Sequence, residues 1–145
     1  MEFLKITLET EPEFEGIARK LFHNYIIKTG DTEYRLTEIE FYWHSPTHPD
    51  PTTYKRIHAY PEAGEWFFHY SGVDIALKND ELQGYGGILI RGLYDIHRKK
   101  SVKGPQVCAM KLFSGHNAFH SDIQTRIIEH SFSPALPIIK RHRFG

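Results

Sequence analysis

Apolar residues recur at helical spacing in one early segment of the chain. In residues 11–25 the apolar positions are Phe14, Ile17, Ala18, Leu21 and Phe22. Positions three and four apart fall on one face of an α-helix, so this spacing gives the segment a continuous apolar stripe. Acidic residues crowd its start, where the positive end of the helix dipole favours them. The pattern predicts a helix over residues 11–25.

The next segment, residues 25–43, alternates like a β-hairpin. Residues 29–31, with the sequence Thr-Gly-Asp, supply the turn. In a strand, successive side chains point to opposite sides. The second half therefore predicts one apolar face and one face that carries two carboxylates beside a tyrosine. The first face holds Ile39, Phe41 and Trp43, and the second holds Leu36, Glu38, Glu40 and Tyr42.

The rest of the chain reads as short strands and turns in a single domain spanning residues 1–145. Strands are predicted over residues 65–70, 73–77, 88–96, 126–130 and 137–144. The other segments are a proline-rich loop over 44–56, a turn over 82–87, a basic connector over 97–105 and a short helix over 106–113. Pro105 suits the first turn of that helix. These elements predict a strand-rich domain with few helices.

Cysteine use and the N-terminus bear on the compartment. Cys108 is the single cysteine and cannot form an internal disulfide, which fits a reducing compartment. The first ten residues lack the basic and apolar regions of a signal peptide. No apolar stretch approaches the roughly 20 residues that a membrane span needs. We therefore expect a cytoplasmic protein with no membrane partner.

Formal net charge is zero, which argues against strong, indiscriminate binding of nucleic acid. The charge is nevertheless uneven. Residues 1–72 hold 12 acidic and 7 basic residues, and residues 73–145 hold 6 acidic and 11 basic residues. Basic residues gather at 98–103 and 140–143. This distribution fits either an ordinary solvated surface or a face that contacts phosphates.

The paired glutamates are the strongest candidates for chemistry. Glu38 and Glu40 lie on one face of the predicted strand, roughly 7 Å apart. A carboxylate held over an aromatic pocket can act as a general base toward water. The same pattern also occurs on an ordinary solvated strand face.

Arg91 and the loop histidines are further candidates. Arg91 lies within an apolar strand, where it needs a partner, either a structural carboxylate or an anion such as a phosphate. His44, His48 and Asp50 are of the residue types that bind zinc and would suit a metal-dependent hydrolase. The sequence has neither a helical His-Glu-x-x-His motif nor a cysteine pair, so we expect no metal site.

Several segments resemble, in order, motifs of the alkyladenine (methylpurine) DNA glycosylase family. Residues 35–42, R-L-T-E-I-E-F-Y, are similar to the family's R-I-V-E-T-E-A-Y, and residues 88–93, I-L-I-R-G-L, to V-L-I-R-A-L. Residues 104–110 resemble the start of G-P-x-x-L-C-x-A-L, and 143–145 resemble R-I-G. Between them lie a loop with histidines and the aromatic segment 66–68, which precedes Gly72 as an aromatic strand precedes a glycine in the family.

The resemblance implies an α+β fold with a curved, mostly antiparallel sheet and a few peripheral helices. It implies an enzyme that flips a damaged purine out of DNA and hydrolyses its N-glycosidic bond without a cofactor or metal. By this resemblance Glu40 activates the attacking water, and Tyr42 and Phe68 form the two faces of the slot that holds the base. The substrate would be duplex or single-stranded DNA, or a nucleoside.

The resemblance also assigns roles around that slot. One of His44 and His48 lies beside the base, and Arg91 faces the nucleotide backbone. The family tyrosine that fills the gap left by the flipped base directly precedes the glycine. Here Ser71 precedes Gly72, and Tyr70 lies one position earlier. An alternative function on the same fold is a non-catalytic module that binds a base, a nucleoside or another planar ligand.

Overall fold

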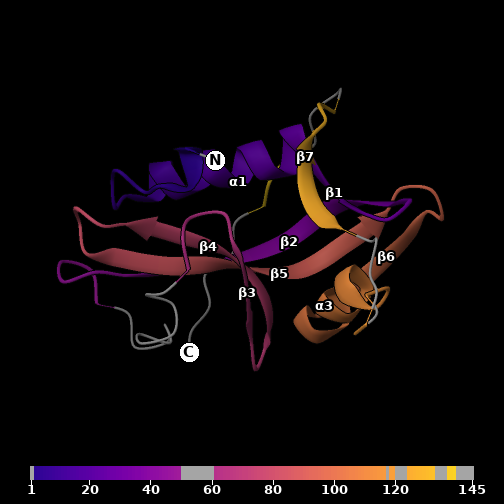
Figure 1. The fold of residues 1–145 in the computed structure, drawn as a ribbon. Coiled ribbons are helices and arrows are strands. Elements are labelled where there is room, and N and C mark those ends of the chain that lie inside the picture. Colours follow the sequence, from indigo (N-terminus) through magenta and orange to yellow (C-terminus); the bar gives the residue numbers. More distant parts are fainter. Residues whose placement is uncertain (1, 50–60, 117, 120–123, 133–136, 140–145) are drawn as a thin grey trace.

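The structure is a computed structural model of the 145-residue chain, and it describes residues 2–49, 61–116, 118–119, 124–132 and 137–139. Its helical elements are η1 (Glu2–Leu4), α1 (Glu11–Asn24) and α3 (Pro105–Phe113). Its strands are β1 (Tyr25–Thr29), β2 (Thr32–His44), β3 (Trp66–His69), β4 (Gly72–Asn79), β5 (Gly84–Asp95), β6 (Lys100–Lys103) and β7 (Thr125–Glu129). The predicted first helix, first hairpin, short second helix and strands at β3, β4 and β7 are confirmed (Figure 1).

The described strands form one antiparallel sheet in the order β3-β4-β5-β2-β1-β7, and β6 pairs with β5. The sheet is a curled half-barrel. Its two edge strands lie close to each other: Trp66 Nε1 on β3 donates a hydrogen bond to the Thr125 carbonyl on β7 at 2.9 Å. The fold is therefore α+β with a curved antiparallel sheet, as expected.

Both helices contribute to one apolar core on one side of the sheet. Ile17 and Leu21 of α1, and Cys108 and Leu112 of α3, belong to the same buried cluster as the strand residues. Phe14 of α1 also packs edge-on against Phe41 of β2, with ring centroids 5.4 Å apart. In Figure 1, α1 lies along the sheet and α3 lies beside the projecting β3–β4 hairpin. The opposite side of the sheet, away from this core, is called the outer face below.

A paired irregularity interrupts the ladder between β2 and β5. The register runs Leu36↔Leu93, Glu38↔Gly92 and Ile39↔Ile90. Thr37 and Arg91 are therefore the extra residues on the two strands, and the alternation of faces shifts by one on each. The absence of a side chain at Gly92 permits this irregularity, because a Cβ at that position would lie 2.7 Å from Thr37 Oγ1. Consequently Leu36 joins the core, and its predicted place on the face of Glu38, Glu40 and Tyr42 is wrong.

Three other boundaries differ from the predictions. The segment expected to be a turn at 82–87 is largely the start of β5, whose glycines allow close approach: a Cβ on Gly86 would lie 1.9 Å from the Tyr42 carbonyl. Part of the expected basic connector is β6, an exposed edge strand on which lysines are common. Residues 137–139 are in no helix or strand, and the rest of the strand predicted over 137–144 lies outside the described residues.

Among the described residues, no helix is long and apolar enough to cross a bilayer.

Candidate functional site

The outer face gathers polar side chains from four neighbouring strands. Directly paired residues of an antiparallel ladder project to the same side. One row runs from Glu40 on β2 through Leu89 and Asp74 to Phe67 on β3. Tyr42 lies two residues from Glu40 and therefore shares its face. The candidate site is built on this outer face, on rigid strands rather than on loops.

Glu40 is held at both carboxylate oxygens. The Tyr42 hydroxyl donates to Oε1 at 2.8 Å, and Arg91 Nη1 donates to Oε2 at 3.0 Å. Arg91 Nε also lies 3.8 Å from Glu38 Oε1. The Glu40 side chain is 19% exposed. Of the two partners predicted for Arg91, the structure shows the carboxylate.

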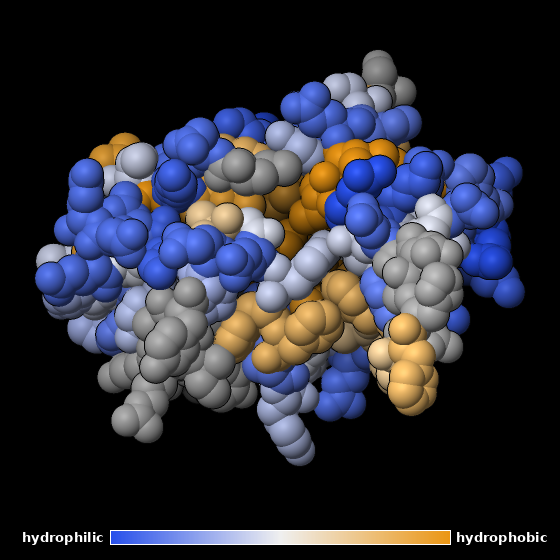
Figure 2. All heavy atoms as spheres, viewed as in Figure 1, coloured by the Kyte–Doolittle hydropathy of each residue, from blue (hydrophilic) through white to orange (hydrophobic). Residues whose placement is uncertain are grey.

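Phe68 does not lie where the resemblance puts it. It pairs with Val73, a core residue, and its ring packs 4.7 Å from that of Phe113 on α3. Its predicted position as a wall opposite Tyr42 is wrong, because a shift of one residue along a strand reverses the face. Phe67 instead lies on the outer face, 7% exposed, whereas Phe68 is 56% exposed. Figure 2 shows apolar surface where β3 and α3 meet.

The two histidines of the loop are separated. His44 lies two residues beyond Tyr42, so it is on the outer face, and its ring centroid is 5.4 Å from that of Tyr85. His48 lies past a tight turn, where it exchanges backbone hydrogen bonds with Ser45 at 3.1 Å, and it is exposed. Only His44 of this pair shares a face with Glu40. Within the ranges that the structure describes, no three His, Cys, Asp or Glu residues are grouped to hold a metal, and Asp50 lies outside those ranges.

Glu9 fixes the end of β2 on which His44 lies. Trp43 Nε1 donates to Glu9 Oε1 at 2.7 Å. Hydrogen bonds from Ser45 and Thr47 lower the pKa of Glu9. The turn that separates His44 from His48 is thereby tied to the segment before α1.

Tyr70 lies at the tip of the β3–β4 hairpin, which projects from the sheet in Figure 1. Its side chain is 89% exposed. The tip rests against α3, since a Cβ on Gly72 would lie 2.9 Å from the Pro105 carbonyl oxygen. Tyr70 and Ser71 line a cavity of about 380 Å³ together with residues 104–107. Tyr70 is therefore accessible at the surface, and Glu40 is not among the residues that line this cavity.

A buried polar pair that was not predicted from the sequence lies behind the hairpin tip. His69 Nε2 lies 2.8 Å from Asp74 Oδ1, and the Ser71 N–H donates to His69 Nδ1 at 3.1 Å. Because Nδ1 accepts, the neutral ring carries its proton on Nε2 and donates to Asp74. The Asp74 side chain is 0% exposed. An aspartate inside the apolar run of β4, with a histidine just across a tight turn, was the available signal.

Gly87 connects this pair to the glutamate site. A Cβ on Gly87 would lie 2.5 Å from Asp74 Oδ2, so the carboxylate packs directly on the β5 backbone. Gly87 is paired with Tyr42 on the other side. Gly87 of β5 therefore contacts both Asp74 of the β3–β4 hairpin and β2, the strand that carries Glu40.

Cys108 is close enough to Glu38 and Arg91 to feel their charges. The pKa of its thiol is raised to about 11, mainly by burial and also by the charge of Glu38, against the opposing effect of Arg91. The thiol is fully buried, so it stays protonated and unreactive at neutral pH.

The chain is similar in sequence to a viral protein. The chain is 28% identical over 120 residues to the uncharacterized protein L759 of Acanthamoeba polyphaga mimivirus, a match that covers 66% of this chain and 54% of the viral protein. The chain thus spans about half the length of the curated relative it matches. No family model and no solved structure matches the chain.

Proposed function

We propose that the chain is a DNA N-glycosylase-like hydrolase that removes a damaged purine, with Glu40 as its general base. The observation that carries the proposal is the fixed carboxylate of Glu40, oriented by Tyr42 and Arg91 on a strand whose sequence resembles the glycosylase motif. A general base needs a defined position relative to the water that it activates. Two hydrogen bonds on separate oxygens supply that position.

The reaction would proceed by displacement at the sugar carbon. Glu40 accepts a proton from water as the water oxygen bonds to C1′ of the nucleotide. The C1′–N bond breaks, and its electron pair leaves with the purine. A neutral purine takes up a proton from solvent, a cationic alkylated purine leaves without one, and Glu40 then releases its proton to solvent. The products are a free base and an abasic sugar. Tyr42 and Arg91 act by holding the carboxylate, and no lysine nucleophile is required.

In the proposed complex the flipped base stacks on Tyr42, with His44 beside it. Phe67 shares the outer face with Glu40, but β4 and β5 lie between them. The base therefore stacks on Tyr42 alone, and neither Phe67 nor Phe68 forms a second wall. Tyr70 at the hairpin tip contacts the strand where the base has left the stack. An exposed aromatic ring can occupy such a gap, and less unstacking energy is needed in single-stranded or mismatched DNA.

A second candidate is a non-catalytic module that binds a base or nucleoside on the same face. One observation favours this candidate. Glu40 is paired with Arg91, and an ion pair of this kind can stabilise the sheet without taking part in catalysis. Binding without bond cleavage distinguishes this candidate from the enzyme.

The test is an excision assay on duplex and single-stranded oligonucleotides that carry hypoxanthine, 1,N6-ethenoadenine or 7-methylguanine. Release of the free base and an alkali-labile site in the strand are the two readouts, measured with and without a metal chelator. We expect release from at least one substrate, unaffected by the chelator. Binding of these strands with no release supports the second candidate, and neither binding nor release contradicts both.

A further inference from the structure

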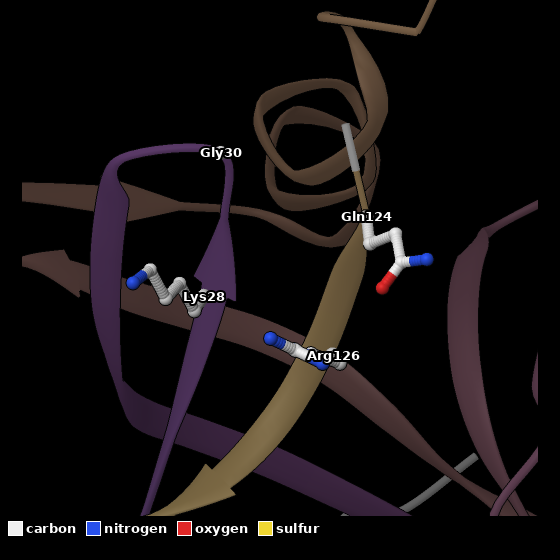
Figure 3. A pocket seen from close by; sticks show the side chains of 4 residues that line it. All are labelled: Lys28, Gly30, Gln124 and Arg126. Carbon is white, nitrogen blue, oxygen red and sulfur yellow. The ribbon is translucent and has the colours of Figure 1, made fainter. Parts of the chain in front are cut away.

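Two basic residues are directly paired on the β1–β7 ladder. Lys28 of β1 is directly paired with Arg126 of β7. Both project to the outer face, because their neighbour Ile27 belongs to the core. Together with Gly30 and Gln124 they line a cavity of about 240 Å³ (Figure 3).

The charge of this pair is not balanced locally. Within the described part of the chain, neither Lys28 nor Arg126 has an acidic side chain within ion-pair distance. The acid nearest by register is Glu33, opposite Lys28 on β2, and its Oε1 contacts His97 Nε2 at 2.9 Å. Like charges directly opposite each other destabilise a sheet. In Figure 3 the Lys28 ammonium points away from the Arg126 side chain.

The donors around the cavity suit a phosphate. An ammonium group offers three N–H donors and a guanidinium offers a planar fork that matches phosphate oxygens. The Gln124 side chain adds an amide to the same cavity. An anion between the two cations would replace their repulsion with two charge-assisted interactions.

The distance to Glu40 indicates the kind of phosphate. Glu33, which lies beside Lys28, and Glu40 are seven residues apart on β2, which corresponds to roughly 23 Å along the strand. At the B-form rise of about 3.4 Å per nucleotide, that length is about seven nucleotides. A nucleoside at Glu40 cannot reach the cavity, whereas a nucleic-acid strand can.

We propose that Lys28 and Arg126 form a phosphate site that holds the backbone of a nucleic-acid strand away from the Glu40 site. That the ligand is a nucleic acid rests on the proposed function. That the site binds an anion follows from the two cationic side chains alone. The site makes an oligonucleotide, rather than a free nucleoside, the substrate of the protein.

The test measures the affinity of the full chain for labelled single-stranded oligonucleotides of 15 and 4 nucleotides over a salt series. Lys28→Ala and Arg126→Ala should each weaken binding of the 15-mer about threefold to tenfold. Each should also reduce the salt slope by about 0.7, the value for one lost phosphate contact on a single strand. Binding of the 4-mer at the Glu40 site, followed by the Glu40 and Tyr42 amide signals, should not change. The matched control is Lys5→Ala, which removes an equal charge that already pairs with Glu2 at 3.4 Å.

Two results would overturn the proposal. An equal loss in Lys5→Ala would mean that overall charge, not this site, sets the affinity. Inorganic phosphate that shifts the Lys28 and Gly30 amide signals, with 15-mer binding unchanged in the variants, would assign the cavity to a free anion. If the protein excises a base but both variants bind the 15-mer as well as the wild type does, this phosphate site is rejected and the proposed function stands. If the variants weaken binding but no substrate is excised, the proposed function is rejected and the phosphate site stands.

Discussion

The two charged clusters on the outer face differ in how their charges are balanced. Around Glu40 each charge meets an opposite charge or a hydrogen-bond donor: Arg91 lies between Glu38 and Glu40, and Asp74 is bonded to His69. At the β1–β7 ladder, Lys28 faces Arg126 with no acid in ion-pair distance among the described residues. We call the first the balanced cluster and the second the cationic pair.

This difference separates two uses of charge on one sheet. In the balanced cluster the partners are internal, so the side chains are already fixed before any ligand arrives, which is what a catalytic carboxylate requires. For the cationic pair, which has no acidic partner among the described residues, we propose that the partner is a phosphate of the ligand. A change in the balanced cluster should therefore damage the protein itself, and a change in the cationic pair should affect its ligand.

The largest effect on folding is expected for Asp74→Ala. The substitution removes the carboxylate that accepts a hydrogen bond from the buried His69 side chain, which is a hydrogen bond to a charged group. We expect the free energy of unfolding to fall by about 3 kcal/mol, as measured by urea denaturation. Asp74→Asn, which keeps an oxygen acceptor, is the matched control and should lose less. Equal stability of Asp74→Ala and the wild type would show that the pair is not a stabilising element.

Arg91→Met should be the next most damaging change. It keeps the apolar stem but leaves the half-buried Glu40 carboxylate without its guanidinium partner. We expect a loss of about 2 kcal/mol in the free energy of unfolding, because breaking such a pair exposes the cost of its burial. The loss should shrink in the double variant with Glu40→Gln. Additive losses in that double-mutant cycle would indicate that the two side chains do not interact.

Cys108 gives a pH-dependent test of the same region. Burial raises the pKa of this thiol to about 11 in the folded protein. An unfolded thiol ionises at lower pH, so the folded state gains stability below about pH 9 and loses that contribution as the pH rises toward 11. Between pH 8 and pH 10 the loss attributable to Cys108 should be about 1 kcal/mol. Comparing the pH dependence of unfolding in the wild type and Cys108→Ala isolates it, and identical curves would refute the burial effect.

The smallest effect, and one of opposite sign, is expected for Lys28→Met in phosphate-free buffer. Removing one of two opposed cations relieves repulsion, so the free energy of unfolding should rise by about 0.5 kcal/mol. Adding phosphate should remove this advantage, because the anion stabilises the wild type. A marked destabilisation in phosphate-free buffer would mean that Lys28 stabilises the folded protein through its own contacts. Lys28 would then resemble Arg91, and the difference between the two clusters would be refuted.

Local pattern was enough to predict much of the fold. The apolar stripe of α1 and the alternation around residues 29–31 are set by near neighbours in sequence, and both elements form as expected. The paired irregularity at Thr37 and Arg91 depends on Gly92 of another strand, so the alternation of β2 alone could not reveal it. That is why Leu36 was assigned to the wrong face.

The candidate site was predictable in part for the same reason. Glu40 and Tyr42 are two residues apart on one strand, so their shared face followed from the sequence. Which of Phe67 and Phe68 lies on the outer face depends on the register of β3 against β4. A sequence match that is displaced by one residue assigns the opposite face to each of them. The cationic pair joins residues 28 and 126, a pairing between distant strands that no local pattern contains.

The central claim, that Glu40 is the general base, is tested most directly by the single-turnover excision rates of Glu40→Gln and Glu38→Gln on the preferred substrate. Both variants remove one carboxylate charge from the same strand and beside the same arginine. If Glu40 is the base, Glu40→Gln should slow excision by on the order of a hundredfold or more with the fold intact, and Glu38→Gln by much less. Equal loss in the two variants, or full activity of Glu40→Gln, would contradict the account.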